Sequence, residues 1–553
     1  MGGRCSSPTL SIASSTTSGG FKKSPHQGGC MRDNLASPPH HAHHYSGDAG
    51  PSGCQSQAGP SGMQLKRSSS RPCNVPGCTQ CGPCARQRPQ EHTMVYREDT
   101  LVSGALEALI RHAIPTPDYF PEDAYLFAFL LCSRLFAPLN DVLVRVIRAM
   151  DRCKDERRSS MLARNVLRFL REWTDNFAYD FREESMMALC IDITQRLVEL
   201  LPACRREVSE LQTDLLAKLT AVETYEEFLN RCGSVRYVES VEELTAAQQE
   251  DQEPVATPCY LLQGSRTDVM DMVRTPTKLA HQLTHVELER LSHIGAEEFV
   301  LAFMKERGVS TTGDDGSGAP LKKTRSKEAY EDWFTRLSYL VATEICKHPK
   351  KKQRLRVLDF WVQTARECYN IGNFNSLMAI NAGLSLAPVA RLKKTWSKVH
   401  CVKCFTVLQN LMSMSDNYKS YRTTLAAAVK RSKQQNVAAQ VPGAHQPPEA
   451  SNDYIVVPFF YLLVKDLHFL NVGCADRLPN GHVNFEKFWQ LAKQVTEFIA
   501  WKQAVCPFPK NTDVIMYLQT SPLLTDNALA LASFECEAPD NGPEKEHYKS
   551  LKK

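Results

Sequence analysis

The sequence has no hydrophobic run long enough to cross a bilayer. An apolar stretch such as residues 124–132 is far shorter than the roughly 20 residues that a membrane-spanning helix needs. The amino-terminal region also lacks a charged segment followed by an apolar core, the pattern that signals secretion. We therefore expect a cytoplasmic protein with no transmembrane segment. Its 20 cysteines should then be reduced thiols rather than disulfides.

A strong charge of one sign is also lacking. The formal net charge is +5 over 553 residues, which is too small to indicate a nucleic-acid partner. No internal repeat stands out, and no pair of residues is spaced for acid–base or nucleophilic catalysis. What is present, 42% hydrophobic and 23% charged residues, is typical of a globular protein with some disordered sequence. The length leaves room for two or three domains.

Residues 1–92 lack hydrophobic periodicity and are rich in Gly, Ser, Pro and His, which predicts a disordered tail. Its first residues, MGGRCS, fit the pattern for myristoylation of Gly2, and Cys5 is available for palmitoylation. Two acyl chains anchor a protein stably, whereas one alone is marginal. The motif is short, so two interpretations stay open: recruitment to a membrane surface, or an accidental match.

The same tail holds clusters of cysteine and histidine that raise the question of a metal. The cysteines are too closely spaced for an ordinary zinc finger, which has a long loop between its ligand pairs. Thiol lipidation or simple disorder explains them better, so we expect no metal and no cofactor. The cysteines are Cys73, Cys78, Cys81 and Cys84, and the histidines are His40, His41, His43 and His44.

Helical spacing of apolar residues begins near Thr93, and the expected fold class is all-α. Residues 93–235 predict a helical N-terminal module, 236–272 a polar linker, 273–525 a larger helical domain, and 526–553 a disordered C-terminal tail. Insertions of loop composition interrupt the larger domain at 308–326 and 432–452. Pro121 should open the second helix of the module. Its first helical stripe should comprise Val102, Ala105, Leu106, Leu109, Ile110 and Ala113.

Residues 456–501 predict two helices folded into a hairpin. Apolar residues recur at helical spacing from Phe460 to Leu470, so Phe460 should point inward. Gly473 and a turn at 479–481 then break the chain. Asn484 is suited to cap the second helix.

Two segments upstream of the hairpin carry further signals. At 370–378 a helix should end at Gly372, and Asn373 should cap the free amides of the next helix. Residues 279–287, LAHQLTHVE, look like the opening helix of the same domain.

These three segments resemble, in the same order, the signature motifs of Ras-family guanine-nucleotide exchange factors. The phrases PEDAYLFAFLLCSRLF, LTHVELERLSHIG and LPNGHVNFEKFW are similar to the RasGEF domain-containing family member 1 group, over about residues 94–525. The resemblance implies an N-terminal accessory (REM) module packed on an all-helical catalytic domain. It also implies release of GDP from a Ras- or Rap-type GTPase, with Rap favoured. The hairpin would act as a wedge without bond chemistry, so the protein would not be an enzyme in the usual sense.

The resemblance also assigns parts to particular residues. Asn373, Phe374 and Asn375 would contact the switch II region of the GTPase. The rest of the cleft would include His281, Leu283, Thr284 and Glu287. The hairpin would contribute Phe459, Phe460, Lys465, His468, Phe469, Val472, Asn484, Glu486 and Gln490.

Several of these positions depart from the best-known relative in the family. His468 stands where that relative has an apolar residue, and Val472 where it has a glutamate that accepts a hydrogen bond from the P-loop hydroxyl. A valine cannot accept that bond. The alternative therefore stays open that the protein is a scaffold that binds a GTPase without releasing its nucleotide. His281 and Gln490 replace basic residues, which argues for a different partner or a slower exchanger.

Overall fold

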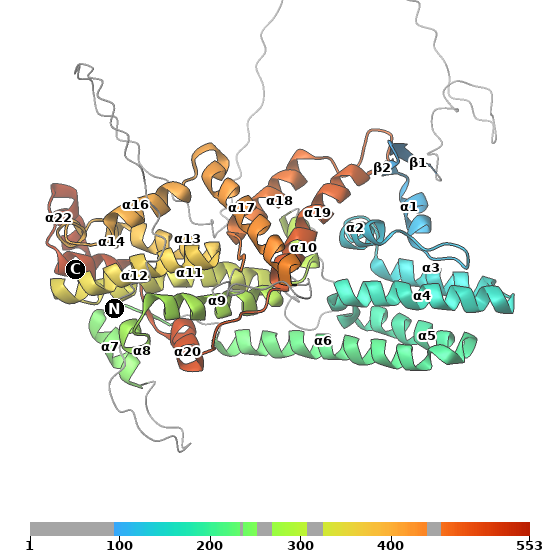
Figure 1. The fold of residues 1–553 in the computed structure, drawn as a ribbon, viewed down its shortest axis with the longest axis horizontal. Coiled ribbons are helices and arrows are strands. Elements are labelled where there is room, and N and C mark those ends of the chain that lie inside the picture. The colour runs from blue at the N-terminus through green and yellow to red at the C-terminus, as the bar shows by residue number, and fades with distance from the viewer. Residues whose placement is uncertain (1–92, 233–235, 251–267, 307–324, 440–454) are drawn as a thin grey trace, which may run out of the picture. The chain divides into compact units, whose positions relative to one another are not determined.

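The computed structural model describes residues 93–232, 236–250, 268–306, 325–439 and 455–553. The predicted tail at 1–92, with Gly2, Cys5 and the clustered cysteines and histidines, lies outside these ranges. So does most of the two predicted insertions. The described residues form helices almost throughout (Figure 1), which confirms the predicted all-α class. None of these helices is long and apolar enough to cross a membrane.

The N-terminal module packs its helices around one core. Helix α4 presents Val166, Phe169 and Trp173 to that core, at the spacing of one helix face. The Trp173 indole donates to Asp180 at 2.9 Å, and Asp180 pairs with Arg134 at 2.8 Å, so the buried charges compensate each other. The helices are α1 Leu106–Ala113, α2 Asp123–Ser133, α3 Leu139–Arg152, α4 Glu156–Asn176, α5 Glu184–Leu200 and α6 Arg205–Cys232, with 3₁₀ turns η2 Ala178–Arg182 and η3 Pro202–Cys204.

The start of this module corrects the predicted first helix. Val102 lies in a strand and Ala105 only caps α1, because the strand at 100–104 pairs with the strand at 94–97 instead of coiling. In so short a strand, buried residues that alternate along the chain look like the start of the helical spacing that follows. The sequence pattern therefore could not separate the strand from the helix. Helix α2 likewise begins at Asp123, two residues after the predicted start at Pro121.

A small antiparallel sheet joins the module to the far end of the chain. Its strands are β1 Met94–Arg97, β2 Thr100–Gly104 and β4 Val483–Asn484, in the order β1-β2-β4. The Trp489 indole also donates to the Leu101 carbonyl at 3.0 Å. Two ring pairs extend the contact, with centroids 5.0 Å apart for Tyr125 and Phe485 and 5.5 Å apart for Phe136 and Phe488.

The larger domain is organised around α11, which packs on α9, α12 and α13. Helix α13 approaches α11 so closely at Gly383 that a Cβ atom there would lie 2.4 Å from the Ser338 carbonyl oxygen. A glycine is therefore needed at this crossing. The helices are α9 Pro276–Ser292, α10 Glu297–Glu306, α11 Arg325–Cys346, α12 Lys351–Ile371, α13 Phe374–Ser385, α14 Ala387–Ala390, α15 Lys393–Trp396, α16 Val402–Leu411, α17 Ser415–Ala439, α18 Phe460–Gly473, α19 Phe485–Lys502 and α20 Thr512–Thr520.

The linker predicted at 236–272 has structure where it is described. Strand β3 Tyr237–Val238 pairs in parallel with β5 Leu523–Leu524, and α7 Val241–Glu250 and α8 Val269–Met272 follow. Leu244 and Ala247 of α7 are buried. The polar composition hid these two apolar positions, which are enough to hold a short helix against its neighbours.

The C-terminal tail predicted to be disordered is instead helical. Helix α21 Asp526–Cys536 is capped by the Thr525 side chain and buries Leu529 and Phe534, and α22 Gly542–Leu551 follows. The carboxylate of Glu537 accepts hydrogen bonds from the backbone amides of Lys394 at 3.0 Å and Thr395 at 2.7 Å. The prediction failed because these bonds join segments more than 140 residues apart.

Candidate functional site

The predicted hairpin is present as α18 and α19, and one face of α18 is open to solvent. Tyr461, Lys465, His468 and Val472 follow one another at intervals of three or four residues, so they share that face. Tyr461 is 58% exposed, Val472 is 69% exposed and the neighbouring Phe469 is 60% exposed. We call Tyr461, Phe469 and Val472 the apolar face of α18. Exposed apolar side chains gathered on one helix indicate a surface for a partner.

Two aromatic residues at the start of α18, Phe459 and Phe460, are enclosed, in contrast to this face. Phe460 is 2% exposed, which confirms the prediction that it points inward. Its ring lies 4.8 Å from that of Tyr330 and 6.0 Å from those of Phe299 and Phe498. Phe459 is buried too, and its backbone N–H donates to the Tyr421 hydroxyl at 2.7 Å. In this structure both rings support the helix from within and present no surface to a partner.

The corner at 370–378 has the predicted form and holds the start of α18. Gly372 ends α12 with a φ of 96°, in the left-handed region, and the Asn373 side chain caps α13. Asn375 accepts a hydrogen bond from the backbone N–H of Phe460 at 3.2 Å. Asn373, Phe374 and Asn375 are all buried. In the structure these side chains hold the hairpin in position, and they expose no surface that a switch II region could contact.

A buried carboxylate ties this corner to the opening helix. Glu287 of α9 accepts hydrogen bonds from Asn375 at 3.0 Å, Ser376 at 2.6 Å and Trp333 at 3.2 Å, and from the Tyr330 hydroxyl. Burial raises the pKa of Glu287 above its usual value. Four donors on one enclosed carboxylate make a rigid junction of α9, α11 and α13. A role inside the domain core explains Glu287 better than direct contact with a partner.

Of the remaining residues predicted to line the cleft, two are buried and one reaches the surface. Leu283 and Thr284 are buried, and the Thr284 hydroxyl oxygen accepts a hydrogen bond from Asn373 at 3.1 Å. His281 is half-buried and stacks on Phe508, with ring centroids 3.7 Å apart. Of the four residues predicted to line the cleft, only His281 reaches the surface.

The second hairpin helix carries two exposed predicted residues and one capping residue. Glu486 and Gln490 of α19 are exposed and four residues apart, so they lie on one face. Asn484 caps α19 as predicted, since its side chain accepts a hydrogen bond from the backbone N–H of Lys487.

On the first hairpin helix, the ammonium nitrogen of Lys465 lies 5.7 Å from the ring centroids of both Tyr418 and Phe469.

A buried lysine that the sequence interpretation missed fixes the turn of the hairpin. The Lys487 ammonium group donates to the side chain and carbonyl of Asn471 at 2.8 Å, to the Cys474 carbonyl at 2.9 Å and to Asp476 at 2.5 Å. The side chain of Lys487 has no exposed surface. A second pair, Arg422 with Asp466 at 2.7 and 2.8 Å, ties α18 to α17. The helix that bears the apolar face is therefore held at both ends.

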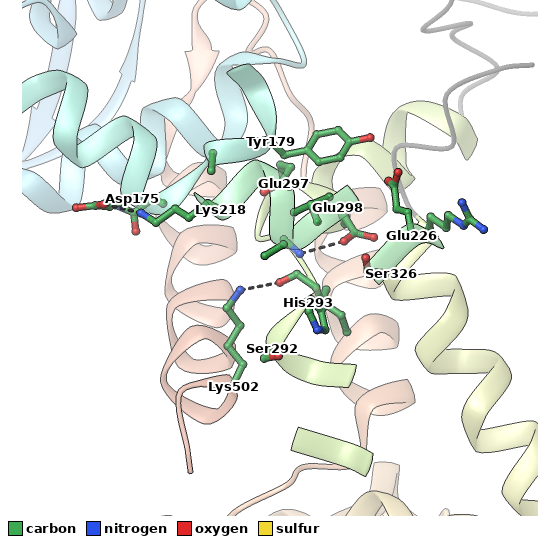
Figure 2. A pocket seen from close by; sticks show the side chains of 17 residues that line it. Asp175, Tyr179, Lys218, Glu226, Ser292, His293, Glu297, Glu298, Ser326 and Lys502 are labelled. Carbon is green, nitrogen blue, oxygen red and sulfur yellow. Dashed lines mark hydrogen bonds and ion pairs between the residues drawn. The ribbon is translucent and has the colours of Figure 1, made fainter. Parts of the chain in front are cut away.

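The N-terminal module meets the larger domain around a pocket of about 380 Å³ (Figure 2). Glu297 and Glu298 of α10 lie at its inner wall, and Lys502 from the end of α19 donates to the Ile294 carbonyl at 2.8 Å. Burial raises the pKa of Glu298 to about 8, although the backbone amides of Gly295 and Lys327 donate to it. Burial lowers the pKa of Lys502.

Residues 278–489 match the RasGEF domain, and residues 100–199 match the RasGEF N-terminal motif. Ras-GEF domain-containing family member 1B of Homo sapiens is 44% identical over 467 residues, which cover 83% of this chain and 92% of that relative. Member 1B-A of Danio rerio is 45% identical (83% and 85% covered), and member 1C of Homo sapiens is 44% identical (81% and 90% covered).

The chain belongs to the family of Ras-GEF domain-containing proteins of the member 1 group. This confirms the family that the sequence motifs indicated. It supports a role as an exchange factor with a Ras-family small GTPase as partner. The predicted domain limits 93–235 and 273–525 stay predictions, since the family matches cover only a part of each.

Proposed function

We propose that the protein promotes GDP release from a Ras- or Rap-type GTPase by wedging α18 against the nucleotide site. The observation that carries the proposal is the apolar face of α18, which is exposed while both ends of the helix are fixed. A wedge has to be stiff, because a flexible helix would yield to the GTPase instead of displacing its switch regions.

The free energy for exchange comes from binding, and no bond is made or broken. A GTPase holds its nucleotide through the P-loop and a Mg²⁺ ion, and those contacts must be lost together. A protein that binds the empty GTPase more tightly than the loaded one weakens nucleotide binding by the same factor. In this sense the protein is a coupling factor and not an enzyme, and it needs no cofactor of its own.

The side chains on the exposed face of α18 are suited to displace parts of the GTPase by their bulk and not by hydrogen bonding. Val472 offers only methyl groups at the exposed face, so it cannot accept a bond from a P-loop hydroxyl. His468 has an acceptor nitrogen when it is neutral, and its ring lies 5.9 Å from that of Phe469. We propose that Phe469 and Val472 exclude water and metal from the site while His468 supplies the one polar contact.

Release of fluorescent GDP from a panel of Ras and Rap proteins tests the proposal. The parent chain should accelerate release from at least one of them, and we expect the largest effect on a Rap protein. Replacing Val472 with serine should reduce the acceleration at least severalfold. The matched control is Val505→Ser, since Val505 is also exposed but lies after α19; its rate should equal that of the parent.

The scaffold function is the second candidate, and Val472 is the residue that favours it. A scaffold would retain a GTPase in a pull-down but leave the GDP release rate at its spontaneous value across the whole panel. Tight binding to nucleotide-loaded GTPase, with no preference for the empty form, would contradict exchange and support the scaffold.

We further propose that the protein works in the cytoplasm and at membranes, where its GTPase partner is anchored. Acylation at Gly2 and Cys5 would provide one route to the membrane. Mass spectrometry of the protein from cells should show a myristoyl group on Gly2. A free or acetylated amino terminus would exclude that route.

A further inference from the structure

Two segments of the larger domain, outside the hairpin motifs, carry charged side chains of only one sign. Residues 345–358 and 391–415 contain no aspartate or glutamate. The two segments lie side by side in the fold, since Arg354 donates to the Thr395 hydroxyl at 3.0 Å and the His400 amide donates to Asp359 at 2.9 Å. Figure 1 shows the second segment, with α16, along α12. The two segments, far apart in the sequence, are therefore neighbours in the fold.

Some cations of these segments turn inward and are satisfied there. Lys347 pairs with Glu344 at 2.6 Å, and Arg391 pairs with Glu544 at 3.0 Å. Arg354 is buried and donates to backbone carbonyls. These three cations stabilise the domain and are not available to a partner.

The other cations point outward, and we call five of them the basic face. All five are exposed, and none forms an ion pair with a carboxylate of the described chain. Lys352 and Arg356 lie four residues apart on α12, on the same stripe as Asp359, which contacts the 397–400 loop. The basic face consists of Lys352, Arg356, Lys394, Lys398 and Lys403.

Exposed apolar side chains lie beside these cations. On α16, Val402 is next to Lys403, and Val407 follows one turn later and is 63% exposed. Cations with long aliphatic stems next to exposed apolar groups suit the interface of a bilayer, where the stems and apolar groups enter the headgroup layer.

The choice of lysine favours a membrane over an acidic protein. Four of the five cations are lysines, which are depleted at protein–protein interfaces, whereas arginine is enriched there. A lysine is a flexible point charge without the fixed fork of arginine. It suits a fluid layer of anionic headgroups, whose charges have no fixed positions.

We propose that the basic face docks the protein on an anionic phospholipid surface. Each cation near such a surface strengthens binding roughly fivefold, and the attraction falls off within a Debye length of roughly 10 Å. This docking does not require acylation of Gly2 or Cys5 and does not depend on nucleotide exchange.

Vesicle flotation with the full chain carrying Gly2→Ala tests the proposal, since that change removes myristoylation. The Gly2→Ala chain, which is the parent in this test, should bind vesicles of phosphatidylcholine with about 30% phosphatidylserine. It should release them as the salt concentration is raised. It should not bind pure phosphatidylcholine. The double variant Lys398→Glu/Lys403→Glu should bind the anionic vesicles at least about tenfold more weakly.

The matched control is Arg148→Glu/Arg157→Glu, which changes the net charge equally on exposed residues of α3 and α4. It should bind like the parent. Equal loss in both variants would show an effect of net charge alone and overturn the proposal, as would unchanged binding by Lys398→Glu/Lys403→Glu. Should that variant unfold, the neutral pair Lys398→Gln/Lys403→Gln replaces it, with the same expectation of weaker binding.

Two further measurements separate this proposal from its alternatives. A parent chain that binds polyglutamate but ignores anionic vesicles would identify a surface for an acidic protein and overturn lipid docking. GDP release from a soluble, unlipidated GTPase should be unchanged in the charge variants, because the basic face is not part of the hairpin. Failure of exchange with intact vesicle binding would therefore contradict the proposed function and leave this inference standing.

Discussion

The two ends of α18 carry side chains of the same kind in opposite environments. Phe460 begins the helix inside the domain core, and Phe469 lies about two and a half turns later with 60% of its surface exposed. An aromatic ring inside the core contributes to the free energy of unfolding, whereas an exposed ring contributes almost nothing to it. The comparison teaches that one helix can be split into an anchoring end and a working end, and mutations can separate the two.

The largest effect is expected at the anchoring end. Phe460→Ala should lower the free energy of unfolding by about 3–5 kcal/mol, because it removes a ring packed against Tyr330, Phe299 and Phe498. Denaturant titration measures this change. A loss below about 1 kcal/mol would mean that the start of α18 is not anchored, and the comparison would fail.

A somewhat smaller loss is expected where the hairpin turns. Lys487→Met removes the ammonium group that satisfies Asn471, Asp476 and the Cys474 carbonyl, and should cost about 3 kcal/mol. The matched control is Lys493→Met on the same helix, where the lysine is exposed and the change should be within about 0.5 kcal/mol. Equal losses at both sites would show that the buried ammonium group does not hold the turn.

The junction between the two domains should respond to pH. The folded pKa of Glu298 is about 8, against 4.5 for an ordinary glutamate, because burial disfavours the charged form. Its contribution to stability is therefore fully present below pH 4.5 and is lost as the pH rises through 8. The parent should lose on the order of 3 kcal/mol more than Glu298→Gln between pH 5 and pH 8. Denaturant titrations at both pH values measure the difference, and identical losses would contradict it.

Replacement of Phe469 should have the smallest effect on stability and the largest effect on nucleotide exchange. Phe469→Ala should change the free energy of unfolding by less than about 0.5 kcal/mol, since the ring is exposed. The same variant should slow stimulated GDP release at least about tenfold if the apolar face contacts the GTPase. Normal exchange by a stable Phe469→Ala protein would remove this ring from the proposed wedge.

Signals within a few residues made much of this fold predictable. The helix ending at Gly372, the cap at Asn373 and the inward Phe460 depend on local geometry and on helical period, and all three are confirmed. The sheet formed by β2 and β4 was not predictable in this way. Strands of two to five residues have no strong period, and the partners are about 380 residues apart.

The site was predictable in position but less so in detail. The motifs placed the hairpin and the corner correctly, yet they did not show that Asn375 and Glu287 bond to each other inside the core. Lysine is seldom buried, so nothing in the sequence marked Lys487 as the centre of the turn. The helix at 526–536 was not predicted, because its alanines, serine and cysteine give only a weak pattern of apolar residues at helical spacing.

The pairing of β2 with β4 has a consequence for synthesis on the ribosome. The first strand of the N-terminal module emerges early, but the residues that complete its sheet, Val483 and Asn484, are made nearly 400 residues later. Until then the aromatic surface around Tyr125 and Phe136 has no cover from α19. The nascent chain therefore carries an adhesive patch through most of its translation, and a shortened protein that stops before residue 483 keeps that patch permanently.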